Sequence, residues 1–91
     1  MNDMIIQLDG HLMTDKASVH DQLQERLSLP GYYGRNLDAL YDLLTSLSEA
    51  TRIELQGKDI MLKQLGAYGA ALLVTLQQAE EAAPNLTLNI F

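Results

Sequence analysis

The sequence predicts an α/β fold, a three-stranded parallel β-sheet packed against about four α-helices. Short runs with strand character, at residues 4–8, 51–55 and 86–90, are separated by two longer segments that hold apolar residues at helical spacing. Parallel strands require such long crossover connections, whereas antiparallel strands can be joined by tight turns. The first strand alternates least between apolar and polar residues, so we expect it in the middle of the sheet.

The first helix is expected to begin at Thr14 or Asp15, because a side-chain oxygen at either position can accept a hydrogen bond from an unpaired backbone N–H. Pro30 and Gly31 are expected to end this helix and to begin a loop that runs to Gly34. Its apolar residues recur at four-residue spacing, which predicts one buried stripe. That stripe consists of Val19, Leu23 and Leu27.

The second helix is expected to run from Asn36, a natural N-cap, to about Leu47. Helical spacing divides its residues between two neighbouring faces. The first face is apolar and is assigned to the core, whereas the second is too polar to be buried. The apolar face carries Leu37, Leu40, Leu44 and Leu47, and the polar face carries Asp38, Tyr41, Asp42 and Thr45.

The second half of the chain predicts a strand, two helices and a final strand. Residues 51–55 alternate between apolar and polar, which is typical of a strand covered on one side. A short helix is expected to end near Gly66, and a longer one is expected from Tyr68 to about Ala82, before Pro84. The short helix is marked by Ile60, Leu62 and Leu65, and the long one by Leu72, Leu73, Leu76 and Ala79.

Composition indicates an acidic globular protein with one domain over residues 1–91, because 47 % apolar residues argue against disorder. The net charge of −6 disfavours nucleic acid and anionic membranes as partners and favours encounter with basic proteins. Without cysteine the chain has no disulfides and no thiolate chemistry. The apolar run at residues 4–6 is too short for a signal peptide or a membrane span, so a cytoplasmic protein is expected.

Few residues favour an enzyme. His11 and His20 lack the neighbours typical of metal ligation, so both are interpreted as surface or loop histidines. Asp38 and Asp42 could form an acid–base pair, but on the outer face of one helix water keeps the two carboxylates alike. We therefore expect no catalytic residue, no metal and no cofactor. A small enzyme acting through the two aspartates remains as a remote alternative.

A binding surface explains more of these residues. Asp38 and Asp42 are one helical turn apart, so arginine or lysine side chains built to hold phosphates could bind them. Tyr32, Tyr33 and Tyr41 supply the large aromatic side chains that dominate protein interfaces. Two simpler explanations remain open: the aspartates only stabilise the start of the helix, and the loop tyrosines pack back onto the core.

The segment from Leu29 to Thr45 resembles the signature of the barstar family. That signature is Leu-Pro, one residue, Tyr-Tyr-Gly, one residue, Asn-Leu-Asp-Ala-Leu, an aromatic residue and Asp, with Leu-Thr shortly after. The resemblance extends more loosely over the whole chain, and it implies a small parallel sheet flanked by helices. The matching residues are Leu29, Pro30, Tyr32, Tyr33, Gly34, Asn36, Leu37, Asp38, Ala39, Leu40, Tyr41, Asp42, Leu44 and Thr45.

The resemblance also implies a function, because barstar-family proteins are intracellular inhibitors that block the cationic active site of a microbial ribonuclease. By position, Asp42 would be the central anion, facing the enzyme's phosphate-binding arginines and catalytic histidine. Asp38 would pair with neighbouring basic residues, and Tyr32 would pack over the catalytic histidine. The resemblance thus implies an immunity protein, monomeric when free, that binds one cognate basic ribonuclease or related toxin. The other contact residues would be Tyr33, Gly34, Asn36, Tyr41, Thr45 and Gln78.

Three positions differ from the family's well-known inhibitor. Tyr41 replaces a tryptophan, Arg35 replaces an acidic residue, and Gln78 replaces a glutamate, for which Glu80 or Glu81 could substitute from a different helical angle. These differences preserve the expected mode of binding but leave the identity of the partner open. The alternative is a barstar-fold protein whose target is a different toxin or an endogenous regulatory partner.

Overall fold

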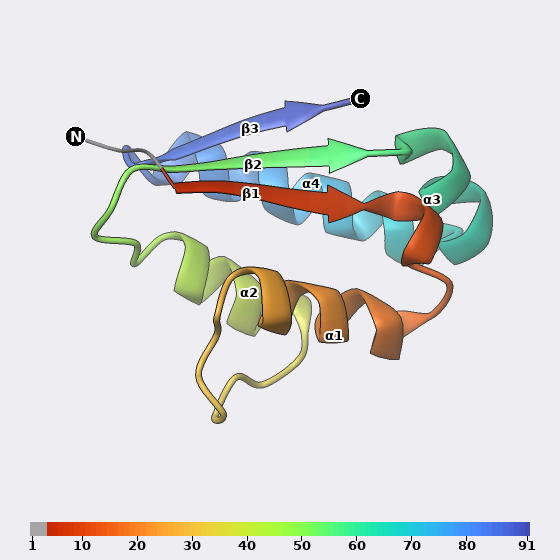
Figure 1. The fold of residues 1–91 in the computed structure, drawn as a ribbon, viewed down its shortest axis with the longest axis horizontal. Coiled ribbons are helices and arrows are strands. Elements are labelled where there is room, and N and C mark those ends of the chain that lie inside the picture. Colours follow the sequence, from red (N-terminus) through yellow and green to blue (C-terminus); the bar gives the residue numbers. More distant parts are fainter. Residues whose placement is uncertain (1–3) are drawn as a thin grey trace.

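The computed structural model describes residues 4–91 and confirms the predicted α/β fold, with three parallel strands in one sheet and four α-helices (Figure 1). The prediction of one domain over residues 1–91 includes three residues that lie outside the described part. A 3-10 turn, Gly10–Leu12, follows the first strand. The other elements are β1 (Met4–Asp9), α1 (Lys16–Arg26), α2 (Leu37–Leu44), β2 (Thr51–Gln56), α3 (Lys58–Leu65), α4 (Ala67–Ala82) and β3 (Leu86–Ile90).

The central strand is β2, so the prediction that places the first strand in the middle is wrong. The order is β1-β2-β3, and Ile53 of β2 pairs with Ile6 of β1 and Leu88 of β3. Each strand lies beside the next one in the chain, as Figure 1 shows. An apolar run predicts burial on both faces, but Ile5 in β1 is 55 % exposed. A run this short therefore does not identify a central strand.

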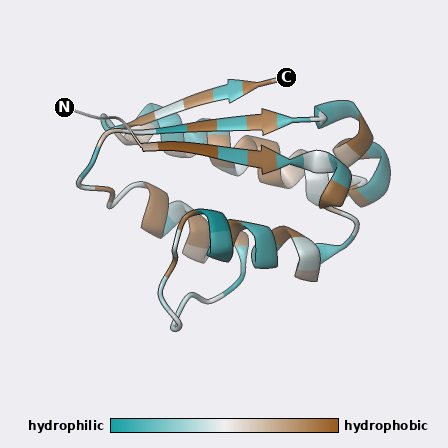
Figure 2. Cartoon of the chain, viewed as in Figure 1, coloured by the Kyte–Doolittle hydropathy of each residue, from teal (hydrophilic) through white to brown (hydrophobic). Residues whose placement is uncertain are grey.

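The hydrophobic core lies between one face of the sheet and the helices. Burial alternates along β2, where Ile53 and Leu55 are buried while Arg52 and Glu54 remain partly exposed. Figure 2 shows this alternation as apolar and polar segments along the strands. Removing these side chains from water provides the main driving force for folding. The helices contribute the fully buried Val19, Leu23, Leu40, Leu44, Met61, Leu72 and Leu76.

Helix α1 begins at the predicted cap. The Asp15 carboxylate accepts from the Ser18 N–H at 2.8 Å, and the Ser18 hydroxyl accepts from the Asp15 N–H at 3.0 Å. These reciprocal bonds form a capping box. Because the bond from the Ser18 N–H favours the charged carboxylate, it holds the pKa of Asp15 below its usual value. Val19 and Leu23 are buried as predicted, whereas Leu27 at the C-cap is only partly buried.

Helix α2 is shorter than predicted, because it ends at Leu44 instead of continuing to Leu47. The Thr45 hydroxyl donates to the Tyr41 carbonyl oxygen at 2.9 Å, and the Ser46 hydroxyl donates to the next carbonyl oxygen at 2.7 Å. Hydroxyl groups that bind backbone carbonyls in this way compete with the regular helical pattern. Leu47 still packs against the core from outside the helix, which preserves the predicted apolar face.

Helix α3 ends just before Gly66, as predicted, and α4 begins at Ala67, one residue ahead of the predicted Tyr68. The φ angle of Gly66 is 60°, in the left-handed region that favours glycine. The fully buried residue of α3 is Met61, whereas the predicted Ile60, Leu62 and Leu65 are only partly buried. Helix α3 packs against both α4 and the 3-10 turn, so its apolar side chains are divided between two neighbours. No helix in residues 4–91 is both long and apolar enough to cross a membrane.

Candidate functional site

The loop between α1 and α2, residues 28–36, is here named the tyrosine loop. It carries two non-glycine residues with positive φ, Ser28 at 52° and Arg35 at 55°. This conformation costs such residues free energy, so the surrounding structure must hold it in place. The turn at Ser28 also corrects the predicted end of α1, which stops at Arg26, ahead of Pro30.

The two tyrosines of this loop have opposite environments. Tyr32 is 85 % exposed, whereas Tyr33 is 5 % exposed and belongs to the core. Burial raises the pKa of Tyr33 to about 12; Tyr68 adds to this increase, and Arg35 opposes it. Tyr33 therefore packs onto the core, which is one of the alternatives left open by the sequence, whereas Tyr32 is exposed to solvent.

A shallow hollow of about 190 Å³ lies between the tyrosine loop and α2. Its walls combine aromatic and aliphatic side chains with one carboxylate, that of Asp42. It brings together four of the predicted site residues, from the loop and from the helix. The lining residues are Tyr32, Tyr33, Gly34, Ala39, Asp42 and Leu43.

The two aspartates of α2 are free to meet a basic partner. Asp38 and Asp42 are exposed, and neither forms an ion pair within residues 4–91. Asp38 lies in the first turn of α2, where the positive end of the helix dipole favours its negative charge. Both carboxylates lie in water on the outer face of one helix.

The other predicted site residues lie outside the lining of the hollow. Asn36 caps α2, since its Oδ1 accepts from the Ala39 N–H at 2.8 Å. The Thr45 hydroxyl is bonded to its own helix, and Tyr41 is partly buried against the core. Gln78 is exposed on α4, a helix that packs against α2. Their roles in binding therefore remain predictions.

Replacing the cap of α2 should destabilise the helix that carries the aspartates. We expect Asn36→Ala to lower the free energy of unfolding by about 0.5–2 kcal/mol, because the N–H of Ala39 loses its acceptor. Urea denaturation measures this change. Asn36→Asp is the matched control, because it retains a capping oxygen and should stay close to wild type. A loss of equal size in both variants would contradict the capping role.

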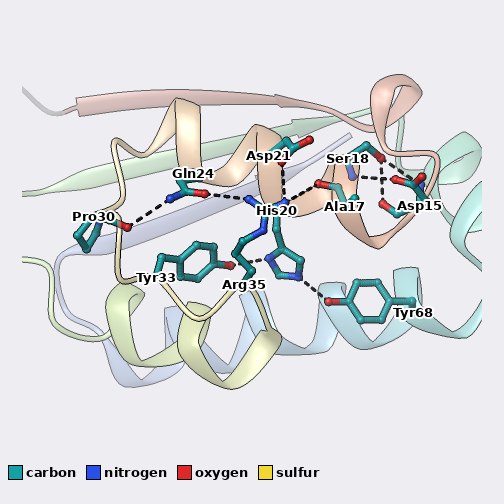
Figure 3. A network of polar contacts seen from close by, with 10 residues as sticks. All are labelled: Asp15, Ala17, Ser18, His20, Asp21, Gln24, Pro30, Tyr33, Arg35 and Tyr68. Carbon is teal, nitrogen blue, oxygen red and sulfur yellow. Dashed lines mark hydrogen bonds and ion pairs between the residues drawn. The ribbon is translucent and has the colours of Figure 1, made fainter.

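The Arg35 side chain extends onto α1 (Figure 3). Its Nη2 donates to Asp21 Oδ1 at 2.6 Å and to the Ala17 carbonyl oxygen at 3.2 Å. Its Nη1 donates to Gln24 Oε1 at 2.8 Å. The positive charge that the sequence places near the acidic helix is thus paired with Asp21.

His20 is 2 % exposed, so its interpretation as a surface or loop histidine is wrong. Its Nδ1 lies 2.6 Å from the Tyr33 hydroxyl, and its Nε2 lies 2.6 Å from the Tyr68 hydroxyl (Figure 3). Burial lowers the pKa of His20, and the nearby Arg35 charge lowers it further. A neutral imidazole has one donor and one acceptor, which suits two hydroxyl partners.

No cluster of histidine, cysteine, aspartate or glutamate in the described part of the chain could hold a metal ion. His11 is exposed, as predicted, and its Nδ1 lies 3.0 Å from Asp9 Oδ1. The two histidines therefore lie in separate surroundings, one in water and one in the core.

Known proteins identify the family of this chain. The family model described as "Barstar (barnase inhibitor)" matches residues 4–90, which include the tyrosine loop and α2. A Bacillus subtilis (strain 168) protein named "Putative ribonuclease inhibitor YrdF" is 36 % identical over 75 residues, which are 81 % of this chain and 82 % of that protein. The chain belongs to the barstar family.

Proposed function

We propose that this chain is a cytoplasmic, non-enzymatic inhibitor of a basic microbial ribonuclease, and that it serves its host as an immunity protein. The observation that carries this proposal is the hollow between the tyrosine loop and α2, lined by the exposed side chains of Tyr32 and Asp42. Membership of the barstar family and the likeness to a protein named as a ribonuclease inhibitor support it. The net charge of −6 suits a basic target.

In the proposed complex, binding alone inhibits the enzyme, because the inhibitor occupies the sites that hold RNA phosphates. Asp42 faces the phosphate-binding arginines and the catalytic histidine, and Asp38 pairs with basic residues beside them. Arginines suit this role, since their forked donors match carboxylate as well as phosphate oxygens. Tyr32 covers the catalytic histidine. One monomeric inhibitor binds one enzyme, without RNA or a cofactor.

The contact is proposed to extend from the hollow along both helices. Tyr33 and Gly34 contribute through the walls of the hollow, and the remaining residues through α2 and α4. Among the acidic neighbours of Gln78, Glu80 accepts from the Leu88 N–H at 2.7 Å, so its carboxylate is occupied within the fold. Glu81 is exposed and is the better substitute for the missing glutamate. The rest of the proposed contact consists of Asn36, Tyr41, Thr45 and Gln78.

A second candidate is a barstar-fold protein that binds a different toxin or an endogenous regulatory partner. It is favoured by the three positions at which this chain differs from the family's well-known inhibitor, Arg35, Tyr41 and Gln78. Of these three differences, Arg35 weighs least against the ribonuclease-inhibitor proposal, because its guanidinium is paired with residues of α1.

The inhibitor hypothesis is tested by titrating purified ribonucleases with this protein while the cleavage of a fluorogenic RNA is followed. The panel contains barnase, which the family description names, and the secreted ribonucleases and toxin domains of the host. We expect activity to disappear at one equivalent for at least one enzyme of the panel. If every enzyme retains full activity in excess protein, the second candidate replaces the first.

Association with the cognate ribonuclease should slow steeply as salt is added. The charge of −6 attracts a basic enzyme over long distances, and salt screens this attraction beyond about 10 Å at 0.1 M. Stopped-flow measurement of the association rate from low to high ionic strength checks this expectation. An association rate independent of salt would contradict electrostatic capture.

A further inference from the structure

The tyrosine loop is attached to α1 at both of its ends through one side chain. Gln24 Nε2 donates to the Pro30 carbonyl oxygen at 3.3 Å, and Gln24 Oε1 accepts from Arg35 Nη1 at 2.8 Å (Figure 3). The Gln24 backbone carbonyl also accepts from the Leu29 N–H at 3.0 Å. Arg35 adds its ion pair with Asp21, so the outer side of the loop is held by α1.

The inner side of the loop is held by His20, which joins three parts of the fold. The imidazole belongs to α1, Tyr33 belongs to the loop, and Tyr68 belongs to α4. Within residues 4–91, neither tyrosine hydroxyl has another hydrogen-bond partner. The position of the loop relative to α4 therefore depends on both nitrogens of one ring.

We propose that Arg35 and His20 are positioning residues that hold the tyrosine loop in its binding geometry in the free protein. Neither residue lines the hollow, but Tyr33, which does, is bonded to His20, and Gly34, which also lines it, precedes Arg35 in the chain. The benefit to binding rests on the proposed function. The order of the loop is a property of the free protein and is tested without a partner.

The advantage of such a device is a smaller entropy loss on binding. Fixing the backbone of one residue costs roughly 1–2 kcal/mol, and a loop ordered only by its partner loses that amount from the binding free energy. The left-handed conformations of Ser28 and Arg35 cost free energy, and this cost disfavours the observed loop geometry. The attachments to α1 and α4 offset this cost during folding, before the partner arrives.

The inner attachment requires a neutral imidazole. The neutral ring accepts the proton of one tyrosine hydroxyl, whereas protonated His20 would donate from both nitrogens and leave that proton, too, without an acceptor in residues 4–91. Arg35 on the loop also opposes a second positive charge, whereas Asp21 on α1 favours it. The charged group near Tyr68 is Lys16, whose Nζ lies 4.9 Å from the centre of the phenol ring.

The lowered pKa of His20 determines the direction of the pH effect. An unfolded histidine binds its proton near pH 6.5, whereas the folded protein resists protonation to a lower pH. The stability from the neutral ring is therefore present above about pH 6.5 and is lost as the pH falls through the folded pKa. We expect the loop to loosen in the same range.

Hydrogen exchange of the Tyr33 amide in the free protein, followed by NMR, measures the order of the loop. This amide donates to the Pro30 carbonyl oxygen at 3.0 Å, so its protection reports the loop conformation. Amides of β2 report global unfolding. Arg35→Gln should reduce the protection of Tyr33 roughly fivefold or more, which corresponds to about 1 kcal/mol, without an equal change in β2.

Two substitutions of His20 form a matched pair. His20→Asn retains a polar group where Nδ1 faces Tyr33, and His20→Gln retains one where Nε2 faces Tyr68. We expect the glutamine variant to lose more protection at the Tyr33 amide than the asparagine variant. Tyr33→Phe, which removes only the hydroxyl, replaces either variant if it does not fold, and it should also reduce the protection.

A pH series separates positioning by the neutral ring from simple packing. Between pH 7.5 and 5.5, protection relative to the intrinsic exchange rate should decrease in wild type and stay constant in His20→Asn. His11→Asn controls for the exposed histidine and should behave as wild type. Wild-type protection in Arg35→Gln, His20→Gln and Tyr33→Phe, or a pH effect that persists in His20→Asn, would overturn the proposal.

Affinity for an enzyme that the wild type inhibits adds the functional measurement. Arg35→Gln should weaken binding through a faster dissociation rate while it retains the one-to-one stoichiometry. If barnase and the host enzymes are all left active by wild type, the proposed function fails, whereas the exchange results still decide the positioning roles. If the variants had less protected loops but unchanged affinity, the proposed benefit to binding would be refuted, whereas the positioning roles would stand.

Discussion

Asp42→Ala should weaken binding to the cognate ribonuclease by about 2–5 kcal/mol and leave the fold intact. Asp42 is exposed and lacks an ion pair within residues 4–91, so its removal breaks no bond of its side chain in the free protein. In the proposed complex, its loss would leave buried arginines without a counter-charge, and that penalty would account for much of the effect. Titration calorimetry measures the change in affinity.

Two further variants distinguish the effect of the Asp42 charge at its position from the effect of the net charge. Asp59→Ala removes a carboxylate from the first turn of α3, an element remote from the tyrosine loop in Figure 1. It should affect affinity only slightly, through the net charge. Asp42→Asn preserves the shape of the side chain and should behave like the alanine variant. Equal affinity of wild type and Asp42→Ala would exclude this residue as the anchor.

Leu40→Ala should lower the free energy of unfolding by about 2–5 kcal/mol. Leu40 is fully buried on the apolar face of α2, where it belongs to the hydrophobic core. Truncation removes favourable burial and leaves a cavity that the surrounding side chains fill only in part. Urea denaturation, with the transition followed by circular dichroism, gives this difference directly.

Leu12→Ala is the matched control for this truncation. Leu12 is 60 % exposed in the 3-10 turn, so the same chemical change should cost far less there. If Leu40→Ala and wild type unfolded at the same urea concentration, the assignment of the faces of α2 would be reversed. The proposed exposure of Asp42 to a partner would then lose its structural basis.

Local sequence signals predict most of the fold and one part of the site. Asn36 marks the start of α2 because its side-chain oxygen accepts from the N–H of Ala39, three residues on, and helical spacing separates Leu40 from Asp42. Strand character predicts β1, β2 and β3 within a residue or two. These properties depend on neighbours in the sequence, so a single sequence reveals them.

Properties that depend on residues distant in the sequence cannot be predicted from local sequence patterns. The ring of His20 meets Tyr33, thirteen positions away, and Tyr68, forty-eight positions away, so no local pattern predicts this buried network. Tyr33 is buried where it meets His20, whereas its neighbour Tyr32 is exposed. Arg35 is another example, because only the folded loop brings it to Asp21.

Competition with a mononucleotide tests most directly whether the inhibitor occupies the phosphate sites of the enzyme. The affinity of this protein for the ribonuclease that it inhibits is measured by calorimetry at increasing concentrations of a nucleoside monophosphate that binds the active site. Because both ligands would need the same arginines, we predict that the apparent Kd rises linearly with the nucleotide concentration. An apparent Kd that stays constant while the active site is saturated would contradict the account.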